Sequence, residues 1–312
     1  PAAVLRRLAD PSIAERVCVG LFDQDDQRAL AASYQSGDFS VADMALLDEL
    51  HAMLGPLPDE PEDADPTLFL SSGSEVSELV TTADLYGRPK ESDPDDDGLA
   101  NYAHLLIDEA QDVTPMQWRM LRRRGPQSSW TIVGDLAQSS WPDLDEVGRS
   151  TRELIGNGMH REFRLSVNYR SPKEVFDLAA QVVKAAYPKA DLPTAVRSTG
   201  IDPDLATTKD AELVDDLTRR IADLGGLVTG TVGVIAPPSR LTELKEAVLA
   251  RLASDDLDLE RVWFVTPLEA KGLEYDAVVV VSPDEIVAES PGGVRVLYVA
   301  LTRPTQRLVT LD

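Results

Sequence analysis

Residues 104–135 read HLLIDEAQDVTPMQWRMLRRRGPQSSWTIVGD, and their pattern indicates the fold class. The apolar run His104–Ile107 predicts a short buried strand, because a strand-length apolar run bounded by polar residues is typical of a covered sheet. Met116–Arg124 predicts a helix, and Ser129–Val133 predicts a second strand that ends in a Gly-Asp pair. A strand, a helix and another strand in this order indicate parallel pairing.

The same alternation continues to the end of the chain and predicts an α/β fold with parallel strands covered on both faces. Further strands are predicted at Arg161–Asn168, Thr231–Ala236, Arg261–Thr266, Ala277–Val281 and Arg307–Leu311. Further helices are predicted at Ser171–Tyr187, Asp210–Leu224, Leu241–Ala253 and Arg295–Thr302. Upstream, Leu and Met at helical spacing predict a helix between an N-cap at Ser40 and a stop at Gly55.

Composition excludes several classes of protein. Apolar residues make up 43% of the 312-residue chain and charged residues 27%, which are ordinary globular values. The single cysteine, Cys18, excludes a disulfide framework and fits a reducing cytoplasm. The three histidines lack metal-ligand spacing, and apolar runs such as Ala277–Val281 are too short to span a bilayer. We therefore expect a cytoplasmic monomer without zinc or membrane contact.

Charge is concentrated in the first third of the chain. The formal net charge is −24, and twelve carboxylates but no Lys or Arg lie between Arg28 and Arg88. A protein that tracks nucleic acid by neutralising phosphates carries a basic stripe, which this third lacks. The acidic stretch Asp38–Asp84 is interpreted either as solvated surface or as a face for a basic partner. The basic cluster Arg119, Arg122, Arg123 and Arg124 is interpreted as a solvated helix end that complements the helix dipole.

Five polar clusters fall at or beside the ends of predicted strands, where ligands bind in open parallel sheets. They are Asp108–Asp112, Gly134–Gln138, Asn168–Ser171, Thr266–Glu274 and Tyr298–Arg303. A carboxylate at a strand tip can hold Mg²⁺, and an adjacent one can activate a water molecule. An aromatic ring can stack on a base, while a guanidinium binds phosphate charge.

Each cluster alone also has a plain structural interpretation. Adjacent acids are common in so acidic a chain, and a Gly-Asp pair often forms a turn after a strand. Tyr169 can be a core residue beside the capping Ser171. Arg303 can simply offset the dipole of the helix that precedes it.

The order and spacing of the clusters favour the functional interpretation. The segments LLIDEAQD, IVGDLAQSSW, LSVNYRS, TPLEAKGLEYDAVVV and LYVALTR together resemble the helicase motifs of superfamily 1, the UvrD/Rep group. The resemblance covers roughly residues 100–312. It implies two RecA-like parallel-sheet lobes of the P-loop NTPase type, and it implies ATP hydrolysis with Mg²⁺.

The resemblance assigns roles around the phosphates of ATP. Asp108 coordinates Mg²⁺, and Glu109 activates the attacking water. Gln138 contacts the γ-phosphate, while Arg170 and Arg303 act as arginine fingers from the second lobe. Fingers of this kind are worth about 10³–10⁵ in rate, because phosphoryl transfer depends on positioning and charge stabilisation.

The resemblance also assigns roles around the base and the ribose. Tyr169 stacks on the adenine. Gly272 and Glu274 line the ribose side of the nucleotide. Together with Asp108, these three residues form the expected nucleotide-binding set.

Domain boundaries follow from the same resemblance. Residues 1–100 are expected to form an acidic helical and loop segment, the end of an insertion plus part of lobe one. Residues 101–160 complete that lobe, and residues 161–312 form lobe two. The chain opens with Pro1 and contains no G-x-x-x-x-G-K-[ST] segment, so we expect a fragment with an incomplete first lobe that does not hydrolyse ATP by itself.

Several departures from the UvrD pattern indicate a particular branch of the superfamily. Ser139–Asp145 retains Trp141 but replaces the rest of a base-stacking segment with Pro and acids, and Leu268 stands where the family has a histidine. Only 95 residues separate Arg170 from Thr266, too few for the accessory domain of UvrD and Rep. These features resemble the HelD type, which implies binding of bacterial RNA polymerase and its release from nucleic acid.

Two alternatives remain at this point. One is an ATP-dependent 3′–5′ DNA translocase or helicase of the UvrD/Rep type in DNA repair. The other is a nucleotide-insensitive binding module on the same scaffold.

Overall fold

The computed structural model describes residues 1–55, 102–141, 143–156, 158–253 and 258–312. They divide into two compact units, the first made of Pro1–Leu105 and Thr114–Thr131, the second of Leu106–Val113 and Ile132–Asp312. This division follows spatial contacts and differs from the expected boundaries at residues 100 and 160, which stay predictions.

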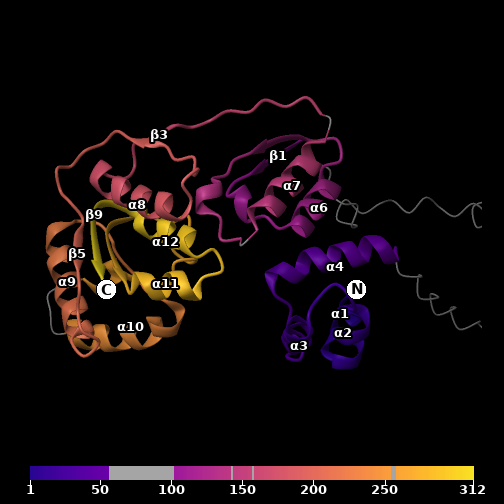
Figure 1. Cartoon of the computed structure of the whole chain (residues 1–312), viewed down its shortest axis with the longest axis horizontal. Helices are drawn as coiled ribbons and strands as arrows, with labels where there is room; N and C mark the ends of the chain where they lie inside the picture. Colours follow the sequence, from indigo (N-terminus) through magenta and orange to yellow (C-terminus); the bar gives the residue numbers. More distant parts are fainter. Residues whose placement is uncertain (56–101, 142, 157, 254–257) are drawn as a thin grey trace, which may run out of the picture. The chain divides into compact units, whose positions relative to one another are not determined.

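The described part of the first unit is mostly helical (Figure 1). Its α-helices are α1 (Ala2–Arg6), α2 (Pro11–Val17), α3 (Gln24–Ser33), α4 (Val41–Leu54) and α6 (Pro115–Arg124). Helix α4 begins after Ser40, whose side chain and that of Asp43 form a capping box, and it ends at Gly55 with φ of 73°. Both predicted ends of this helix are therefore confirmed.

Helix α6 is joined to α4 by ion pairs. The Arg123 guanidinium pairs with Asp48 and with Glu49, whose side chains are 15% and 24% exposed. Arg124 lies 3.5 Å from the Asp48 carboxylate. The interpretation of this basic run as a solvated helix end is therefore wrong for Arg123, because α4 places carboxylates opposite it. Residues 56–84 of the acidic stretch lie outside the described residues.

Strands β1 (His104–Ile107) and β2 (Ser129–Ile132) pair in a two-stranded sheet. In the sequence, α6 lies between them. The predicted strand–helix–strand unit is thus confirmed. The expected burial of the first strand is wrong, because exposed and half-buried residues alternate along it and Leu106 is 68% exposed. The helix starts at an N-cap, Thr114, which forms a capping box with Gln117, and Pro115 occupies the first turn. The segments that follow β1 and β2 carry the polar clusters Asp108–Asp112 and Gly134–Gln138.

The second unit contains a five-stranded, all-parallel sheet with the strand order β5-β9-β8-β6-β7. The strands are β5 (Asp204–Ala206), β6 (Val232–Ile235), β7 (Val262–Val265), β8 (Tyr275–Val281) and β9 (Pro304–Leu311). Their interiors are rich in Val, which favours a sheet buried on both faces. The predicted α/β fold with a parallel sheet is confirmed for this unit.

Helices cover both faces of this sheet (Figure 1). Helices α8 (Lys173–Ala186), α11 (Pro283–Glu289) and α12 (Val294–Leu301) pack on one face, and α9 (Leu213–Leu227) with α10 (Pro238–Leu252) on the other. Along β8, Val278 and Val280 face the first group, while Val279 and Val281 face the second. This alternation is the period of two that a strand imposes on its side chains.

Two predicted elements around residue 170 differ from the structure. The strand predicted at Arg161–Asn168 shrinks to β3 (Val167–Asn168), which pairs in parallel with β4 (Thr194–Ala195). Phe163 and Leu165 are 82% and 85% exposed, so their alternation does not mark a buried face. Helix α8 starts at Lys173, with Pro172 as its N-cap and not inside its first turn.

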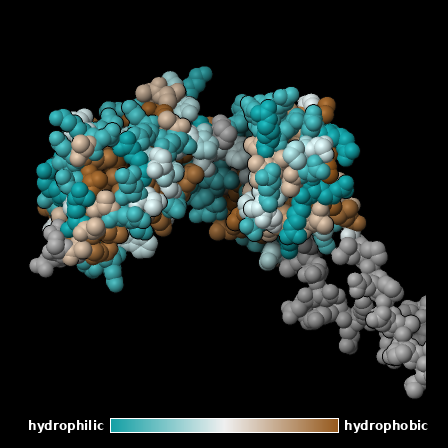
Figure 2. Space-filling view, turned by 90° about the horizontal axis from the view of Figure 1, so that it is seen from below, coloured by the Kyte–Doolittle hydropathy of each residue, from teal (hydrophilic) through white to brown (hydrophobic). Residues whose placement is uncertain are grey.

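A further helix, α7 (Leu144–Ile155), lies where no element was predicted and ends at Gly156. Figure 2 shows a mostly hydrophilic face with small hydrophobic groups among the polar residues, as the charged composition leads one to expect. Among the described residues, none of the helices combines the length and the apolar character needed to cross a membrane.

Candidate functional site

The backbone turns sharply after β1 at Glu109, the predicted water-activating residue. Glu109 has φ of 50°, in the left-handed region that residues other than Gly and Asn rarely adopt. The N–H of Glu109 donates to the Asp108 carboxylate at 2.8 Å. The next N–H, of Ala110, donates to the carbonyl of Val133 at 2.9 Å. Such a backbone state costs about 1–3 kcal/mol and is typical of functional sites.

Gln111 is a buried amide, 2% exposed, that ties this turn to the end of β2. Its Nε2 donates to Oε2 of Glu109 at 2.6 Å, and its Oε1 accepts from the N–H of Asp135 at 2.8 Å. The Ser139 hydroxyl donates to the Gln111 carbonyl at 3.1 Å. A Cβ at Gly134 would lie 2.9 Å from Oε1 of Gln111, so this contact requires glycine there. Gln111 therefore fixes the Glu109 carboxylate.

Gln138 closes the short 3-10 helix η3 (Leu136–Gln138) and faces Arg303. Asp135 caps η3 by accepting from the N–H of Ala137 at 2.9 Å and from Nε2 of Gln138 at 2.8 Å. Oε1 of Gln138 accepts from Nη2 of Arg303 at 3.0 Å. Asp135 thus orients the amide so that its oxygen meets the guanidinium.

Arg303 follows α12 and is only 2% exposed. Its Nε donates to the Val299 carbonyl at 3.0 Å, and its Nη1 donates to the Leu273 carbonyl at 3.3 Å. Burial lowers the pKa of Arg303 to about 10, and the neighbouring charge of Arg170 acts in the same direction, while Glu109 raises it. Arg303 therefore stays charged at neutral pH, and its charge lies near both Arg170 and Glu109.

Arg170 is placed by a turn after β3. The N–H groups of Arg170 and Ser171 both donate to Oδ1 of Asn168, at 2.9 and 3.2 Å. The buried Ser171 hydroxyl donates to the Thr302 carbonyl at 3.4 Å, which links this turn to the end of α12. Nη1 of Arg170 donates to Glu274 at 2.8 Å, and both side chains are more than a third exposed. A pair this exposed is worth at most about 1 kcal/mol and can exchange its partner for another anion.

Lys271 holds Gln138 from the other side. Its ammonium pairs with Asp112 and donates to the Gln138 carbonyl at 2.5 Å, and its side chain is 13% exposed. Oδ1 of Asp112 accepts from the N–H and hydroxyl of Ser140, at 2.9 and 2.7 Å. Lys271 and Asp112 therefore hold the backbone at the Gln138 carbonyl and at the Ser140 N–H.

Arg295, 5% exposed, fixes the loop that follows Gln138. Its Nε donates to the Ser139 carbonyl at 3.1 Å, and its Nη2 donates to the Trp141 carbonyl at 2.7 Å. Its Nη1 donates to the Tyr187 hydroxyl at 3.0 Å. A Cβ at Gly292 would lie 3.0 Å from the Ser139 carbonyl oxygen, so the two backbones approach closely.

The structure connects five of the predicted site residues. Glu109 is linked through Gln111 and Asp135 to Gln138, and Gln138 is linked to Arg303. Arg170 and Glu274 pair with each other, and both charges act on Arg303.

Three predicted site residues stand outside this network. Asp108 is exposed, and its carboxylate bonds only its own neighbour's N–H among the described contacts. Tyr169 is 72% exposed, which leaves its ring available for stacking. Gly272 has φ of 75°, and a Cβ there would meet nothing within 4 Å. Their predicted roles stay predictions.

A preformed metal cage is not present in the described part of the chain, where no group of three or more His, Cys, Asp or Glu side chains is placed to hold an ion. Mg²⁺ in phosphate-transfer sites commonly takes one or two protein carboxylates and completes its shell with phosphates and water. A single exposed carboxylate such as Asp108 fits that donor set.

Five residues that hold this network received no role from the sequence: Gln111, Asp112, Asp135, Lys271 and Arg295. Lys271 and Gln111 lie inside quoted motifs, so their motif position was a signal for them. Arg295 precedes the last motif, and an arginine among apolar helix residues was its signal. The sequence gives no direct sign that its partners are the carbonyls of Ser139 and Trp141.

The chain is similar in part to known helicases. Residues 79–141 match the UvrD/REP helicase N-terminal domain. The ATP-dependent DNA helicases UvrD2 of Mycobacterium tuberculosis and Mycobacterium bovis are 37% identical over 92 residues, which is 27% of this chain. That alignment covers 12% of each relative, so the chain spans only a small part of their length.

Solved structures of helicases are also similar. The C-terminal domain of a possible DNA helicase from Lactobacillus plantarum WCFS1 aligns with 46% of this chain and 87% of its own length, at 21% identity and a TM-score of 0.35. Arterivirus nonstructural protein 10, a helicase in complex with DNA, aligns with 68% of this chain and 40% of its own, at 15% identity and a TM-score of 0.37. The domain match and the UvrD2 similarity thus relate part of this chain to UvrD-like helicases.

Proposed function

We propose that this chain is part of the motor of an ATP-hydrolysing, UvrD-like protein. The observation that carries the proposal is the hydrogen bond of 3.0 Å between the buried Arg303 and Gln138, with Glu109 tied into the same network. A cation, an amide and a carboxylate held together in this way are the groups that phosphoryl transfer requires.

We infer a task for each of three side chains. Glu109, held by Gln111 in a strained turn, accepts a proton from the attacking water. Arg303 stays protonated and stabilises negative charge that develops on phosphate oxygens. Arg170 exchanges its exposed partner Glu274 for a phosphate oxygen, which the weakness of that ion pair permits.

Gln138 connects nucleotide state to the rest of the unit. Its Oε1 accepts a hydrogen bond from Arg303, and its backbone carbonyl accepts one from Lys271. The carbonyl of the next residue, Ser139, accepts one from Arg295. When a phosphate oxygen accepts the hydrogen bond from Arg303, the Gln138 side chain loses this partner. The loop Ser139–Trp141 that follows Gln138 is then held by fewer contacts. This exchange is the proposed switch between nucleotide states.

ATP and Mg²⁺ fit the donor set at the end of β1. Asp108 would hold the metal ion, which supplies charge neutralisation for the phosphates when bound. Tyr169 would stack on the adenine, and Gly272 with Glu274 would face the ribose. The chain has no G-x-x-x-x-G-K-[ST] segment, so we propose that these 312 residues alone do not turn over ATP.

Two targets are candidates for the motor. The similarity to the UvrD2 DNA helicases favours a DNA translocase. The net charge of −24, the Ser139–Asp145 segment and Leu268 favour a protein target, and the resemblance to the HelD type makes bacterial RNA polymerase the proposed one. We propose the polymerase as the target, working in the cytoplasm, with DNA translocation as the alternative.

Turnover in the full-length protein tests the proposal. ATP hydrolysis is measured alone, with purified RNA polymerase, and with single-stranded DNA as the rival stimulant. Binding of polymerase with turnover indifferent to DNA supports the polymerase target. Strong stimulation by DNA without polymerase binding supports the translocase. No turnover under any condition, with folding verified, would contradict the motor itself.

A further inference from the structure

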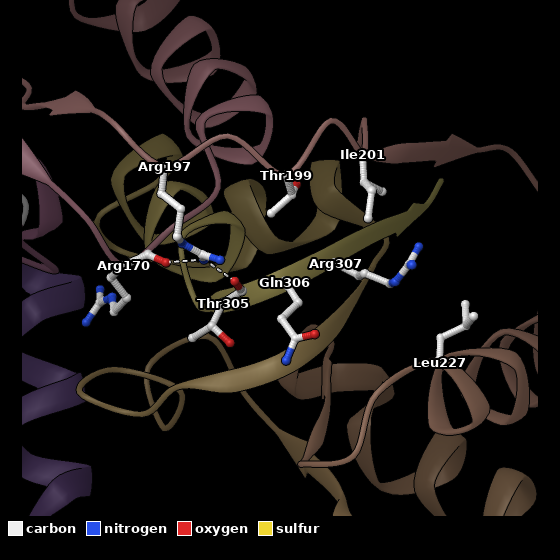
Figure 3. A pocket seen from close by; sticks show the side chains of 8 residues that line it. All are labelled: Arg170, Arg197, Thr199, Ile201, Leu227, Thr305, Gln306 and Arg307. Carbon is white, nitrogen blue, oxygen red and sulfur yellow. Dashed lines mark hydrogen bonds between the residues drawn. The ribbon is translucent and has the colours of Figure 1, made fainter.

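A cavity of about 490 Å³ opens beside the start of β9, apart from the Gln138–Arg303 network (Figure 3). Of the described residues that line it, Arg170, Arg197 and Arg307 are arginines and none is a carboxylate. In a chain with a net charge of −24, a cavity lined in this way is a local exception. Its volume lies in the roughly 300–1,000 Å³ range of small-molecule sites.

Backbone carbonyls hold Arg197 in the cavity wall. Its Nε donates to the Tyr169 carbonyl at 3.3 Å, and its Nη2 donates to the carbonyls of Arg170 and Thr305. Figure 3 shows the latter two bonds, which hold the guanidinium between the turn after β3 and the start of β9. The Nη1 donors bond no residue that the structure describes, and they remain for a ligand.

Arg307 supplies a second cation. It lies on β9, is partly buried, and makes neither a hydrogen bond nor an ion pair with the described residues. Figure 3 shows its side chain extending to the side of the cavity where Ile201 and Leu227 lie. A partly buried guanidinium without a partner gains more from a bound anion than a fully solvated one, because less water competes for it.

The polar wall between the arginines is also held in place. The Glu174 carboxylate accepts from the Ser198 hydroxyl at 2.5 Å, from the N–H and hydroxyl of Thr199 at 3.3 Å, and from the Gly200 N–H at 2.9 Å. These bonds lower the pKa of Glu174 to about 2, so its charge is engaged by the loop itself. Thr199 thus presents a fixed wall next to the cations.

We propose that this cavity binds a small phosphate-bearing molecule that also has an apolar part. Arg197 and Arg307 hold the phosphate, since guanidinium donors match phosphate oxygens. Ile201 and the 59%-exposed Leu227 cover the apolar part. The cavity lacks Tyr169, Gln138 and Arg303, so it is separate from the candidate nucleotide site, although Arg170 borders both.

The test is a titration of the chain with three probes, AMP, inorganic phosphate and a 5′-phosphorylated single-stranded oligonucleotide. Calorimetry gives the affinities, and the NMR shift of the Ile201 methyl group reports occupancy of the cavity. We expect AMP to bind more tightly than phosphate and to shift the Ile201 signal. The Arg307→Gln variant should weaken AMP binding about tenfold or more, and Arg307→Lys should weaken it less.

Matched variants separate this inference from the proposed function. Arg219→Gln removes the same charge from an exposed position on α9 and should leave AMP binding unchanged. If Arg303→Gln abolishes AMP binding while Arg307→Gln does not, the ligand occupies the candidate nucleotide site and the cavity inference is overturned. Tighter, Arg307-dependent binding of the oligonucleotide would overturn the small-molecule assignment. Absence of any Arg307-dependent binding by a variant with unchanged thermal unfolding would overturn the whole inference.

Discussion

The two faces of the five-stranded sheet bury similar apolar side chains but differ in what accompanies them. Against α9 and α10 the core consists of apolar residues, and neither helix contributes a buried polar side chain within the described part of the chain. Against α8, α11 and α12 the core also encloses Arg295, Thr302 and Arg303. The buried guanidinium groups donate hydrogen bonds to backbone carbonyls and to the amide oxygen of Gln138, and these bonds offset the cost of removing them from water.

The difference indicates how one sheet serves two purposes. The α9–α10 face contributes stability through area removed from water. The α12 face accepts a desolvation penalty in order to fix charged groups at set positions. Changes on the first face should therefore alter unfolding, and changes on the second should alter turnover more than unfolding.

The largest expected effect comes from Arg303 on the α12 face. Arg303→Ala should reduce ATP turnover of the full-length protein by about 10³-fold or more, because the finger charge is lost. Arg303→Lys keeps the charge but not the donor pattern, and it should recover only part of the rate. Steady-state kinetics checks both, with Arg219→Ala as a surface control. A rate unchanged in Arg303→Ala would remove Arg303 from the chemistry.

The next effect belongs to the opposite face. Ile221 on α9 is fully buried, so Ile221→Ala should lower the free energy of unfolding by about 2–5 kcal/mol through lost burial and a cavity. Turnover per folded molecule should not change. Urea denaturation measures the first quantity. Ile286→Ala, fully buried beside α12, is the matched variant and should also lower turnover. Equal turnover in the two variants would erase the distinction between the faces.

A smaller effect is expected from a substitution at Gly134, which lies against the side-chain amide of Gln111. In Gly134→Ala the new methyl group meets Oε1 of Gln111 at 2.9 Å and the Ala110 methyl at 3.3 Å. Displacing Gln111 should lower the free energy of unfolding by about 1–3 kcal/mol and should reduce turnover, since Glu109 loses its support. Urea denaturation and steady-state kinetics measure the two effects. Gly226→Ala, where a Cβ meets nothing within 4 Å, is the control.

The smallest expected effect is a pH dependence of the folding stability, which comes from Glu174 beside the cavity. Hydrogen bonds from Ser198, Gly200 and Thr199 lower the pKa of Glu174 from 4.5 to about 2. A carboxyl with a depressed folded-state pKa contributes stability above pH 4.5, and this contribution is lost as the pH falls toward 2. Thermal unfolding between these pH values should therefore show a steeper loss for the native chain than for Glu174→Gln. Identical slopes would contradict the assignment.

Much of the fold was predictable from the sequence, because strands such as Ala277–Val281 are continuous apolar runs that only a doubly covered sheet accommodates. The helix from Ser40 to Gly55 was predictable from its end signals. The strand predicted at Arg161–Asn168 is wrong over most of its length, because Phe163 and Leu165 have no partner strand among the described residues and remain exposed. Alternation predicts a strand only where a neighbour completes its hydrogen bonds.

The site was predictable in its residue types and less so in its contacts. Motif resemblance indicated Glu109, Gln138 and Arg303, and the structure links them through Gln111 and Asp135. Those links join loops that follow different strands. Sequence spacing does not show how close two such loops lie in the folded chain. Arg295 could not be placed for the same reason, since its acceptors are backbone carbonyls that carry no residue-specific signal.

The most direct test of the account is a double-mutant cycle between Gln138 and Arg303. Turnover of the full-length protein is measured for Gln138→Ala, Arg303→Lys and the double variant. If the hydrogen bond between the two side chains couples them, the double variant should be no slower than Arg303→Lys alone, with a coupling of about 1 kcal/mol or more. Rate losses that simply multiply would show two independent residues and would contradict the proposed switch.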